Sequence, residues 1–374
     1  MLDLILHKHL VVPFFTALLL SLCLTPCALR LSLRIGAMDR PDDRKIHGQP
    51  VPSLGGLAIA IALLATICVF FQLDRKMLAF VTGALVALAT GLIDDIYHIH
   101  PAMKFLGGVL GSVLFLIIGG MTLDNLGNLF GFGDLLTGRL APFLTVFCMT
   151  GVMNAFNLSD GLDGLAGGIS AIACIFLGIY AYLHNDGICL SILVVLLGAT
   201  LGFLRYNMHP ATVFMGDTGS MLLGYSLSAV SVMMVQPTSQ GVPLAPVTVA
   251  AVLALPILDT LLVMLRRILH GSNPFLPDRV HLHHRLLDMG FPHVTAVSIL
   301  YLCTGSFGIL SMAMQHLSEG MQLLAVLVWA GAIYGAVFML QLHGYHYKTS
   351  RPSKSLSLEG VLKDALSPNR DTNP

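Results

Sequence analysis

Apolar stretches recur along the 374-residue chain, and they constrain its fold more than any other feature. Each is roughly twenty residues long, the length that an α-helix needs to cross the hydrocarbon core of a bilayer. Because lipid offers no partner to backbone N–H and C=O groups, such stretches must form helices. The sequence therefore predicts an all-α polytopic membrane protein. About eleven spans are expected, near residues 11–33, 54–71, 77–93, 104–120, 141–157, 165–183, 187–203, 218–235, 245–265, 294–314 and 321–342.

The composition agrees with lipid as the main solvent. Charged residues make up 11% of the chain, whereas soluble domains carry about 25%. The net charge is zero, so the basic surface that nucleic acid would need is not expected. The 7 cysteines lie mostly inside apolar runs without a CxxC pair, which favours small buried hydrophobes over a disulfide framework or a cysteine metal site.

The positions of Lys and Arg predict how the chain crosses the membrane. One side receives Arg30, Arg34, Arg40, Arg44, Lys45, Lys104, Arg205, Arg266, Arg267, Arg279 and Arg285, and the other receives Lys8, Arg75, Lys76 and Arg139. Basic residues favour the cytoplasm, so the N-terminus is expected outside and the C-terminus inside. The first span carries its charges after the apolar run, unlike a signal peptide, and is expected to remain in the protein as a membrane span. Residues 1–343 would form the integral-membrane catalytic domain, and the polar residues 344–374 a disordered cytoplasmic tail.

Acidic residues gather on the predicted cytoplasmic side. Asp94 and Asp95 end the third span, where two adjacent carboxylates near hydrocarbon are costly to ionise without a cation. They indicate either a metal or proton-transfer site or a solvated helix end. Asp217 precedes the eighth span and could cap that helix, bind metal, or do both.

The segment NAFNLSDGLDGLAGG carries a polar residue at every third position. On a helix these side chains would lie along one face, where four carbonyl-bearing groups suit a hard cation. The alternative is a glycine-rich turn with Asx caps. The four residues are Asn154, Asn157, Asp160 and Asp163.

The longest internal loop, RRILHGSNPFLPDRVHLHHRLLDMG, is rich in Arg and His. These side chains are donors that match diphosphate oxygens, and Arg can bind them in a bidentate manner. A zinc site at HLHH is the alternative, although no remaining ligand set is evident.

Asp259 is an acid well inside an apolar run and is a functional or structural-network candidate without an identifiable partner. Carboxylates, an Asn and a basic loop on one side indicate Mg2+-assisted phosphoryl transfer.

Four ordered motifs resemble the polyprenyl-phosphate N-acetylhexosamine-1-phosphate transferase superfamily. They are the paired Asp residues at a helix end, NAFNLSDGLDGLAGG, VFMGDTGS and PDRVHLHHRLL, and with RKIHGQPVPSLGG the resemblance spans residues ~40 to ~290. HLHH followed by RLL is similar to the branch that uses UDP-GlcNAc, the WecA-like and teichoic-acid-initiating enzymes. Some relatives continue the first motif as DDxxD, and His98 replaces the third acid here.

The resemblance implies roles for individual residues. Asp94 and Asp95 would interact with the lipid phosphate, one of them as its base, and Asp160 and Asp163 would contact the nucleotide-sugar. The implied metal ligands are Asn157 and Asp217, for Mg2+ with Mn2+ able to substitute. The implied catalytic residues are Asp94, Asp95, Asp160, Asp163 and His283, and the implied substrate-binding residues are Lys45, Lys104, Asn154, Arg279, His281, His284 and Arg285.

The implied reaction joins UDP-GlcNAc and undecaprenyl phosphate to give undecaprenyl-diphospho-GlcNAc and UMP, on the cytoplasmic face of a bacterial inner membrane. This step would initiate a cell-envelope polysaccharide. Other UDP-N-acetyl sugars (GalNAc, QuiNAc, FucNAc or MurNAc-pentapeptide) remain alternative donors, and direct attack or an Asp phospho-intermediate remain alternative mechanisms. A secondary transporter is the rival class, but transporter sites lie near the membrane midplane. The sequence leaves the oligomeric state open, a homodimer included.

Overall fold

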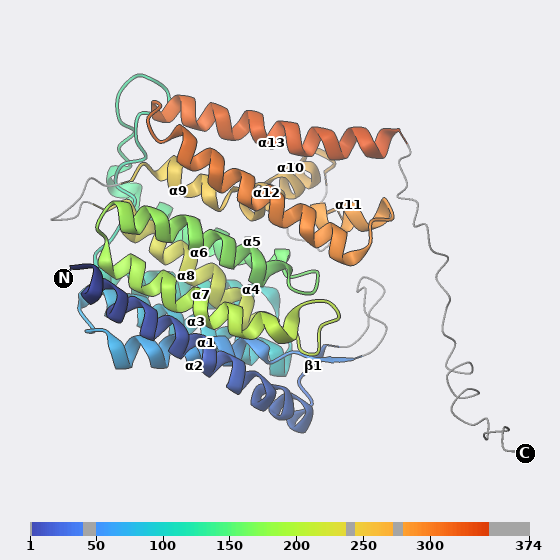
Figure 1. Cartoon of the computed structure of the whole chain (residues 1–374). Helices are drawn as coiled ribbons and strands as arrows, with labels where there is room; N and C mark the ends of the chain where they lie inside the picture. The colour runs from blue at the N-terminus through green and yellow to red at the C-terminus, as the bar shows by residue number, and fades with distance from the viewer. Residues whose placement is uncertain (1, 40–49, 237–243, 272–279, 344–374) are drawn as a thin grey trace, which may run out of the picture.

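The computed structural model describes residues 2–39, 50–236, 244–271 and 280–343, and within them helices dominate (Figure 1). The helices lie side by side in one bundle, as expected for an all-α membrane protein. They are α1 (Leu2–Ile35), α2 (Gly55–Phe70), α3 (Arg75–Tyr97), α4 (Pro101–Gly119), the 3-10 turn η1 (Gly138–Leu140), α5 (Ala141–Ser159), α6 (Leu165–Leu183), α7 (Gly187–Asn207), α8 (Gly216–Met234), α9 (Pro246–Val252), α10 (Ala254–Leu269), α11 (Leu282–Asp288), α12 (His293–Met314) and α13 (Glu319–Leu342). The predicted tail, together with Lys45 and Arg279, lies outside the described residues.

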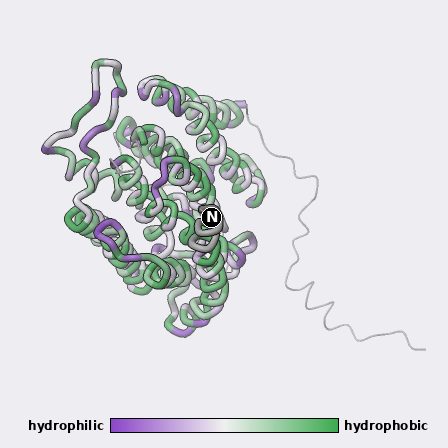
Figure 2. Tube along the Cα trace, turned by 60° about the vertical axis from the view of Figure 1, so that its left-hand side comes forward, coloured by the Kyte–Doolittle hydropathy of each residue, from purple (hydrophilic) through white to green (hydrophobic). Residues whose placement is uncertain are grey.

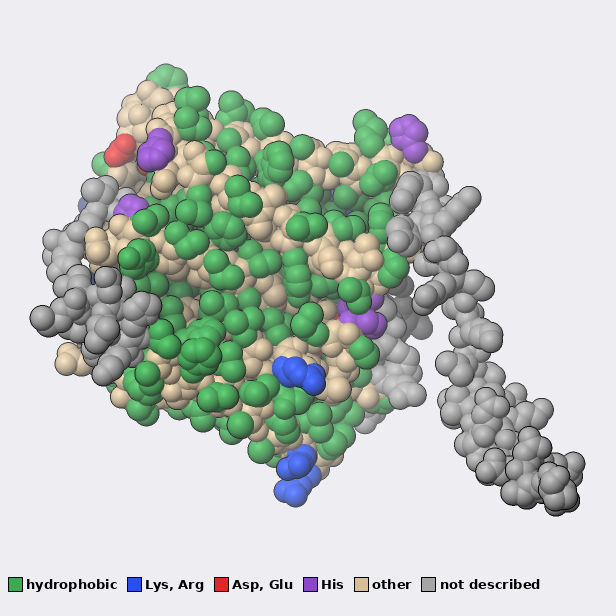
Figure 3. All heavy atoms as spheres, in the orientation of Figure 1, with side chains coloured by type: hydrophobic (Ala, Val, Ile, Leu, Met, Phe, Trp, Pro, Cys, Tyr) green, Lys and Arg blue, Asp and Glu red, His purple; other side chains and the backbone are tan. Residues whose placement is uncertain are grey.

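The outer surface of the bundle is apolar, as a lipid-facing protein requires. Hydrophobic side chains cover most of the face drawn in Figure 3, and in Figure 2 the hydrophilic segments lie mainly at helix ends and in loops. Within the described residues, 8 helices are long and apolar enough to span a membrane, or 9 if the bent pair α9–α10 is one span. Each of the predicted apolar segments coincides with a helix or with this pair. The chain is therefore a polytopic membrane protein.

The predicted span near residues 245–265 is not one helix. It is divided into α9 and α10, whose axes differ by 87° across a break at Leu253. Pro256 follows this break. A proline lacks the N–H that would bond to the carbonyl four residues earlier, and its ring clashes with that carbonyl, which here belongs to Val252, the last residue of α9. The proline explains why the helix is interrupted at this point.

Helix α8 lies in the centre of the bundle, in contact with α2, α3, α5 and α6. Nearly all of its side chains are buried. Small residues let the neighbouring backbones approach closely, as is common between membrane helices. A Cβ atom added at Gly91 of α3 would lie 2.5 Å from the Cα atom of Thr218 in the first turn of α8. This contact sets the start of α8 directly against the end of α3.

A short antiparallel hairpin follows α1. Its strands are β1 (Met38–Asp39) and β2 (Val51–Pro52), with Met38 opposite Pro52. The N–H of Phe214 donates to the Pro52 carbonyl over 2.8 Å, and the N–H of Gly55 donates to the Phe214 carbonyl over 2.9 Å. These bonds join the α1–α2 connection to the loop that leads into α8. In Figure 1 the hairpin and α11 lie at the same end of the bundle.

Candidate active site

Asp95 holds the first turn of α8. Its carboxylate accepts the backbone N–H groups of Asp217 and Thr218 over 2.8 and 2.9 Å, and the Thr218 hydroxyl over 2.5 Å. The first N–H groups of a helix have no partner within the helix, and here a carboxylate from α3 supplies one. The expectation that Asp217 caps α8 is therefore wrong: Asp217 lies in the first turn, and Asp95 accepts the N–H groups.

Lys104 connects two other carboxylates. Its ammonium, in the first turn of α4, lies 3.2 Å from an oxygen of Asp94 and forms an ion pair with Asp217. The side chains of Lys104 and Asp94 are largely buried. The family resemblance implies that Lys104 binds substrate, and the structure places its ammonium between Asp94 and Asp217.

Asn157 completes this group from the last turn of α5. Its side-chain amide donates to a carboxylate oxygen of Asp217 and, over 2.8 Å, to the Ser220 hydroxyl. The structure thus brings the two predicted metal ligands, Asn157 and Asp217, into contact. Ser220 was not singled out from the sequence, although it is the last residue of the VFMGDTGS motif and lies three residues after Asp217 in α8. We call Asp94, Asp95, Lys104, Asn157 and Asp217 the carboxylate cluster.

The charges of the carboxylate cluster do not balance. Three carboxyl groups face one ammonium in a partly buried setting, where repulsion between ionised carboxylates is strong. Oxygen atoms of Asp94, Asp217 and Asn157 are hard donors of the kind that Mg2+ prefers. The donor set therefore fits a divalent cation.

Asp160 and Asp163 lie beyond the helix that the spacing predicted. Helix α5 ends at Ser159, so the four polar residues of this motif do not share one helical face. The side chain of Asn154 donates to its own helix, to the carbonyl of Thr150. Removal from water raises the pKa of the Asp160 carboxyl well above its ordinary value, and the negative charges of Asp217 and Asp95 raise it further. Asp160 is thus electrostatically coupled to the carboxylate cluster.

Asp163 has different partners. Its carboxylate accepts the Ala211 N–H over 3.1 Å and lies 2.7 Å from Nδ1 of His209. His293 approaches from α12, where its Nε2 accepts the Asp163 N–H over 3.1 Å. No local sequence pattern joins His209 and His293 to Asp163, because they are separated from it by 46 and 130 residues.

The partner of Asp259 lies in the segment that carries His281, His283 and His284, which we call the histidine loop. Nδ1 of His281 lies 2.7 Å from one carboxylate oxygen of Asp259, and the Leu282 N–H donates to the other over 3.0 Å. The hydroxyl of Tyr334 also reaches Asp259, over 3.5 Å. Asp259 therefore fixes both the ring of His281 and the first residue of α11.

His283 faces the loop that carries Asp160. The ring is buried, and a Cβ atom added at Gly161 would lie 2.3 Å from its Nε2. Only glycine can stand at this position without moving the imidazole. Burial lowers the pKa of His283 well below its ordinary value, and the neighbouring His284 and His281 lower it further. The ring is neutral at pH 7, so it can donate or accept a hydrogen bond but supplies no charge.

His284 and Arg285 lie in the same short helix. The rings of His283 and His284 are 4.2 Å apart, and those of His281 and His283 are 5.9 Å apart. The guanidinium of Arg285 donates through Nε to the Val280 carbonyl over 2.9 Å. Because α11 begins at Leu282, His281 precedes the helix and is not part of a helical face.

Comparison with known proteins gives one family model and several relatives. Residues 77–235 match the model of glycosyl transferase family 4. A probable undecaprenyl-phosphate N-acetylglucosaminyl 1-phosphate transferase of Bacillus subtilis is 36% identical over 322 residues, which cover 86% of this chain and 89% of the relative. A decaprenyl-phosphate N-acetylglucosaminephosphotransferase of Mycolicibacterium smegmatis is 36% identical over 80% of each chain. An undecaprenyl-phosphate alpha-N-acetylglucosaminyl 1-phosphate transferase of Escherichia coli K12 is 27% identical over 93% of each chain.

The matched region contains α3, α4, α5 and α8, the helices that hold the carboxylate cluster. The chain belongs to glycosyl transferase family 4.

Proposed function

We propose that this membrane enzyme transfers GlcNAc-1-phosphate from UDP-GlcNAc to undecaprenyl phosphate, giving undecaprenyl-diphospho-GlcNAc and UMP. The observation that carries the proposal is the carboxylate cluster, in which Lys104 and Asn157 contact Asp217. The relatives described above carry names for this transfer to polyprenyl phosphates. Such a product would initiate a cell-envelope polysaccharide.

The chemistry requires little covalent participation by the protein. An oxygen of the lipid phosphate attacks the β-phosphorus of the nucleotide-sugar. The bond between this phosphorus and the bridging oxygen breaks, and that oxygen leaves with UMP. Phosphoryl transfer of this kind depends mainly on positioning and charge neutralisation. Asp94, whose partner is the flexible Lys104, is our candidate for accepting a proton from the lipid phosphate.

Asn157 and Asp217 would hold a Mg2+ ion, for which Mn2+ can substitute. The support is the unbalanced charge and the oxygen donors of the carboxylate cluster. When bound, the ion supplies neutralisation of the donor's diphosphate. Lys104 contributes a positive charge that is already in place.

The surroundings of Lys104 favour a lipid acceptor. Met103 and Leu106 flank it on α4, and each exposes 59% of its surface. An isoprenoid tail could lie in the bilayer along this apolar surface while its phosphate reaches Lys104 and Asp94.

We assign donor binding to the histidine loop and the Asp160 loop. His283 lies against Gly161, so these two loops meet next to the carboxylate cluster. His281, His284 and Arg285 offer donors for diphosphate oxygens, and Asp160 is assigned to the nucleotide-sugar. Lys45 and Arg279 keep the substrate-binding roles that the family resemblance implies.

We infer that the site faces the cytoplasm of a bacterial inner membrane, with eleven spans and the N-terminus outside. Described basic residues such as Arg34, Lys104 and Arg285 support this sidedness. In Figure 1 the chain begins at one end of the bundle and α13 finishes at the other, as an odd number of crossings requires. A homodimer is compatible with the proposal but is not required by it.

A substrate panel tests the donor assignment. Purified protein in detergent would be given undecaprenyl phosphate, Mg2+ and one UDP-sugar at a time, and UMP release would be measured. UDP-GlcNAc should give the highest kcat/KM, and omission of the lipid or addition of excess EDTA should stop the reaction. A clear preference for UDP-GalNAc or UDP-MurNAc-pentapeptide would contradict the donor, and UMP release in excess EDTA would contradict the ion.

A further inference from the structure

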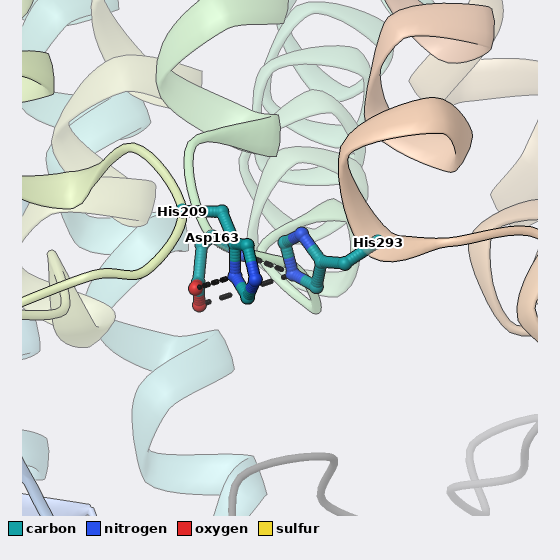
Figure 4. A group of neighbouring side chains, drawn as sticks. All are labelled: Asp163, His209 and His293. Atoms are coloured by element: carbon teal, nitrogen blue, oxygen red, sulfur yellow. Dashed lines mark hydrogen bonds and ion pairs between the residues drawn. The ribbon is translucent and has the colours of Figure 1, made fainter. Parts of the chain in front are cut away.

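Three metal-ligating side chains converge outside the carboxylate cluster. They are Asp163 in the α5–α6 loop, His209 in the α7–α8 loop and His293 at the first residue of α12 (Figure 4). The ligand atoms that they offer lie within 4.8 Å of one another. We propose that this histidine–aspartate group is a second metal site, which binds a divalent transition-metal ion such as zinc.

The chemistry of the donors distinguishes this site from the carboxylate cluster. Two imidazoles and one carboxylate match zinc and related ions, whereas Mg2+ prefers oxygen ligands alone. Three protein ligands also leave one position of a tetrahedral ion for water. The two sites therefore take ions of different classes.

The present contacts show that the side chains are already assembled. Nδ1 of His209 lies 2.7 Å from one oxygen of Asp163, and Nε2 of His293 lies 4.0 Å from the other. The two imidazole rings stack with centroids 4.2 Å apart and planes 19° apart. Ligands about 2.1 Å from one zinc ion lie roughly 3–4 Å from each other, so small rotations of the side chains suffice. An ion would replace the proton between His209 and Asp163 and the hydrogen bond from the Asp163 N–H to His293.

A second observation concerns the other nitrogen of His293. Its Nδ1 is buried and has no hydrogen-bond partner among the described residues. Leaving a buried polar atom unsatisfied costs about 1–3 kcal/mol, so a histidine that merely filled space here would be unfavourable. Coordination through Nε2, the nitrogen that faces Asp163, would give the ring a function that offsets this cost.

The position of the site gives the ion a structural role. Asp163 follows Asp160 in one loop, and His209 lies in the loop that leads to Asp217, while His293 begins α12. An ion bound to all three would join the two loops that border the carboxylate cluster to α12. An ion that binds only the folded chain stabilises it by mass action, so zinc should raise the unfolding temperature.

The test is direct measurement of bound zinc, which does not depend on the proposed transferase activity. The full chain would be purified in detergent without a polyhistidine tag, stripped with a chelator, and dialysed against micromolar Zn2+ with millimolar Mg2+ present. Elemental analysis of wild-type protein should find one zinc per chain. His209→Ala and His293→Ala should each lower this occupancy at least tenfold and abolish the zinc-dependent rise in unfolding temperature.

Two further variants locate the ion. His316→Ala removes an exposed histidine whose ring contacts Gln315, and it should retain zinc. His283→Ala should also retain zinc, because the histidine loop is not part of this site. The proposal is overturned if wild-type protein holds no zinc, if His209→Ala and His293→Ala bind it normally, or if the zinc is lost only in His283→Ala. His209 is exposed, so its variant is expected to fold and keeps the test decisive.

Discussion

Asp94 and Asp95 are neighbours in the chain, but their carboxylates have different surroundings. Both oxygens of Asp95 accept hydrogen bonds from the first turn of α8, so this carboxylate is committed to the fold. Asp94 contacts only the ammonium of Lys104 among the hydrogen bonds described above and keeps acceptor capacity for a substrate. The structure therefore separates a pair that the sequence presented as one motif: Asp95 positions Asp217, and Asp94 is the candidate for chemistry.

Replacing each carboxylate by an amide tests this separation. Asp94→Asn should lower turnover by ~10²–10⁴, the usual loss for a general base, with little change in thermal unfolding. Asp95→Asn should destabilise the fold by about 1–3 kcal/mol, because one oxygen becomes a donor that faces N–H groups. UMP release and unfolding in detergent would be measured for both. Near-normal turnover in Asp94→Asn would leave that residue with a structural role only.

His283 makes stability depend on pH. Its pKa is lowered well below 6.5 in the folded chain, whereas unfolding returns it to the ordinary value of about 6.5. Below about pH 6.5 the unfolded chain therefore binds a proton that the folded chain does not, and stability is lost as the pH falls towards the lowered pKa. The unfolding temperature should decrease between about pH 7.5 and 5.5, and it should decrease less in His283→Gln. His316→Gln is the control, and equal slopes in all three proteins would contradict the buried neutral ring.

At the scale of elements, the hydrophobic pattern predicted the helices well but not their interruptions. The segment 165–183 coincides with α6 because an apolar run in lipid has no other stable backbone conformation. The break at Leu253 was missed because the segment stays apolar through the bend, and only Pro256 marks it. The three-residue spacing of Asp160 and Asp163 suggested a helix, but α5 ends at Ser159, and Gly164 has a left-handed backbone conformation that a helix does not allow.

The site was predictable as a set of motifs and not as a set of contacts. Asp217 and Asn157 were expected to act together, and the structure joins them. The partner of Asp259 could not be found, because a hydrogen bond between α10 and the residue before α11 leaves no local pattern in the sequence. His209 and His293 were missed for the same reason.

The Asp259–His281 contact predicts how α10 controls the histidine loop. Asp259→Ala should release the His281 ring and the first N–H of α11, and the KM for UDP-GlcNAc should rise at least tenfold while the KM for undecaprenyl phosphate stays near wild type. Asp259→Asn can still accept the Leu282 N–H and should be less impaired. Initial rates with each substrate varied separately would measure both constants. A defect confined to the lipid substrate would contradict this assignment.

For the whole molecule, Figure 1 shows that the helix ends and loops lie at two opposite ends of the bundle. The loop between α4 and η1 carries Phe132, which is 96% exposed. The exposed His98 is the first residue after α3 and lies three positions beyond Asp95. These two positions are separated by one crossing, α4, and should therefore face opposite sides of the membrane.

Cysteine labelling in intact cells tests the orientation, after the native cysteines are replaced. A membrane-impermeant maleimide should label Phe132→Cys from outside and should label His98→Cys only after permeabilisation. This result is expected from the distribution of basic residues. Labelling of His98→Cys in intact cells would reverse the topology and exclude the use of a cytosolic nucleotide-sugar.

The central claim is that a sugar phosphate moves, not the sugar alone. UDP-GlcNAc labelled with 32P at the β-phosphorus distinguishes the two, because transfer of GlcNAc-1-phosphate carries the label into the lipid and transfer of GlcNAc leaves it in UDP. Wild-type protein with undecaprenyl phosphate and Mg2+ should yield labelled lipid and unlabelled UMP, and Asp217→Ala should yield neither. Label retained in UDP, or labelled lipid formed at the wild-type rate by folded Asp217→Ala, would contradict the account.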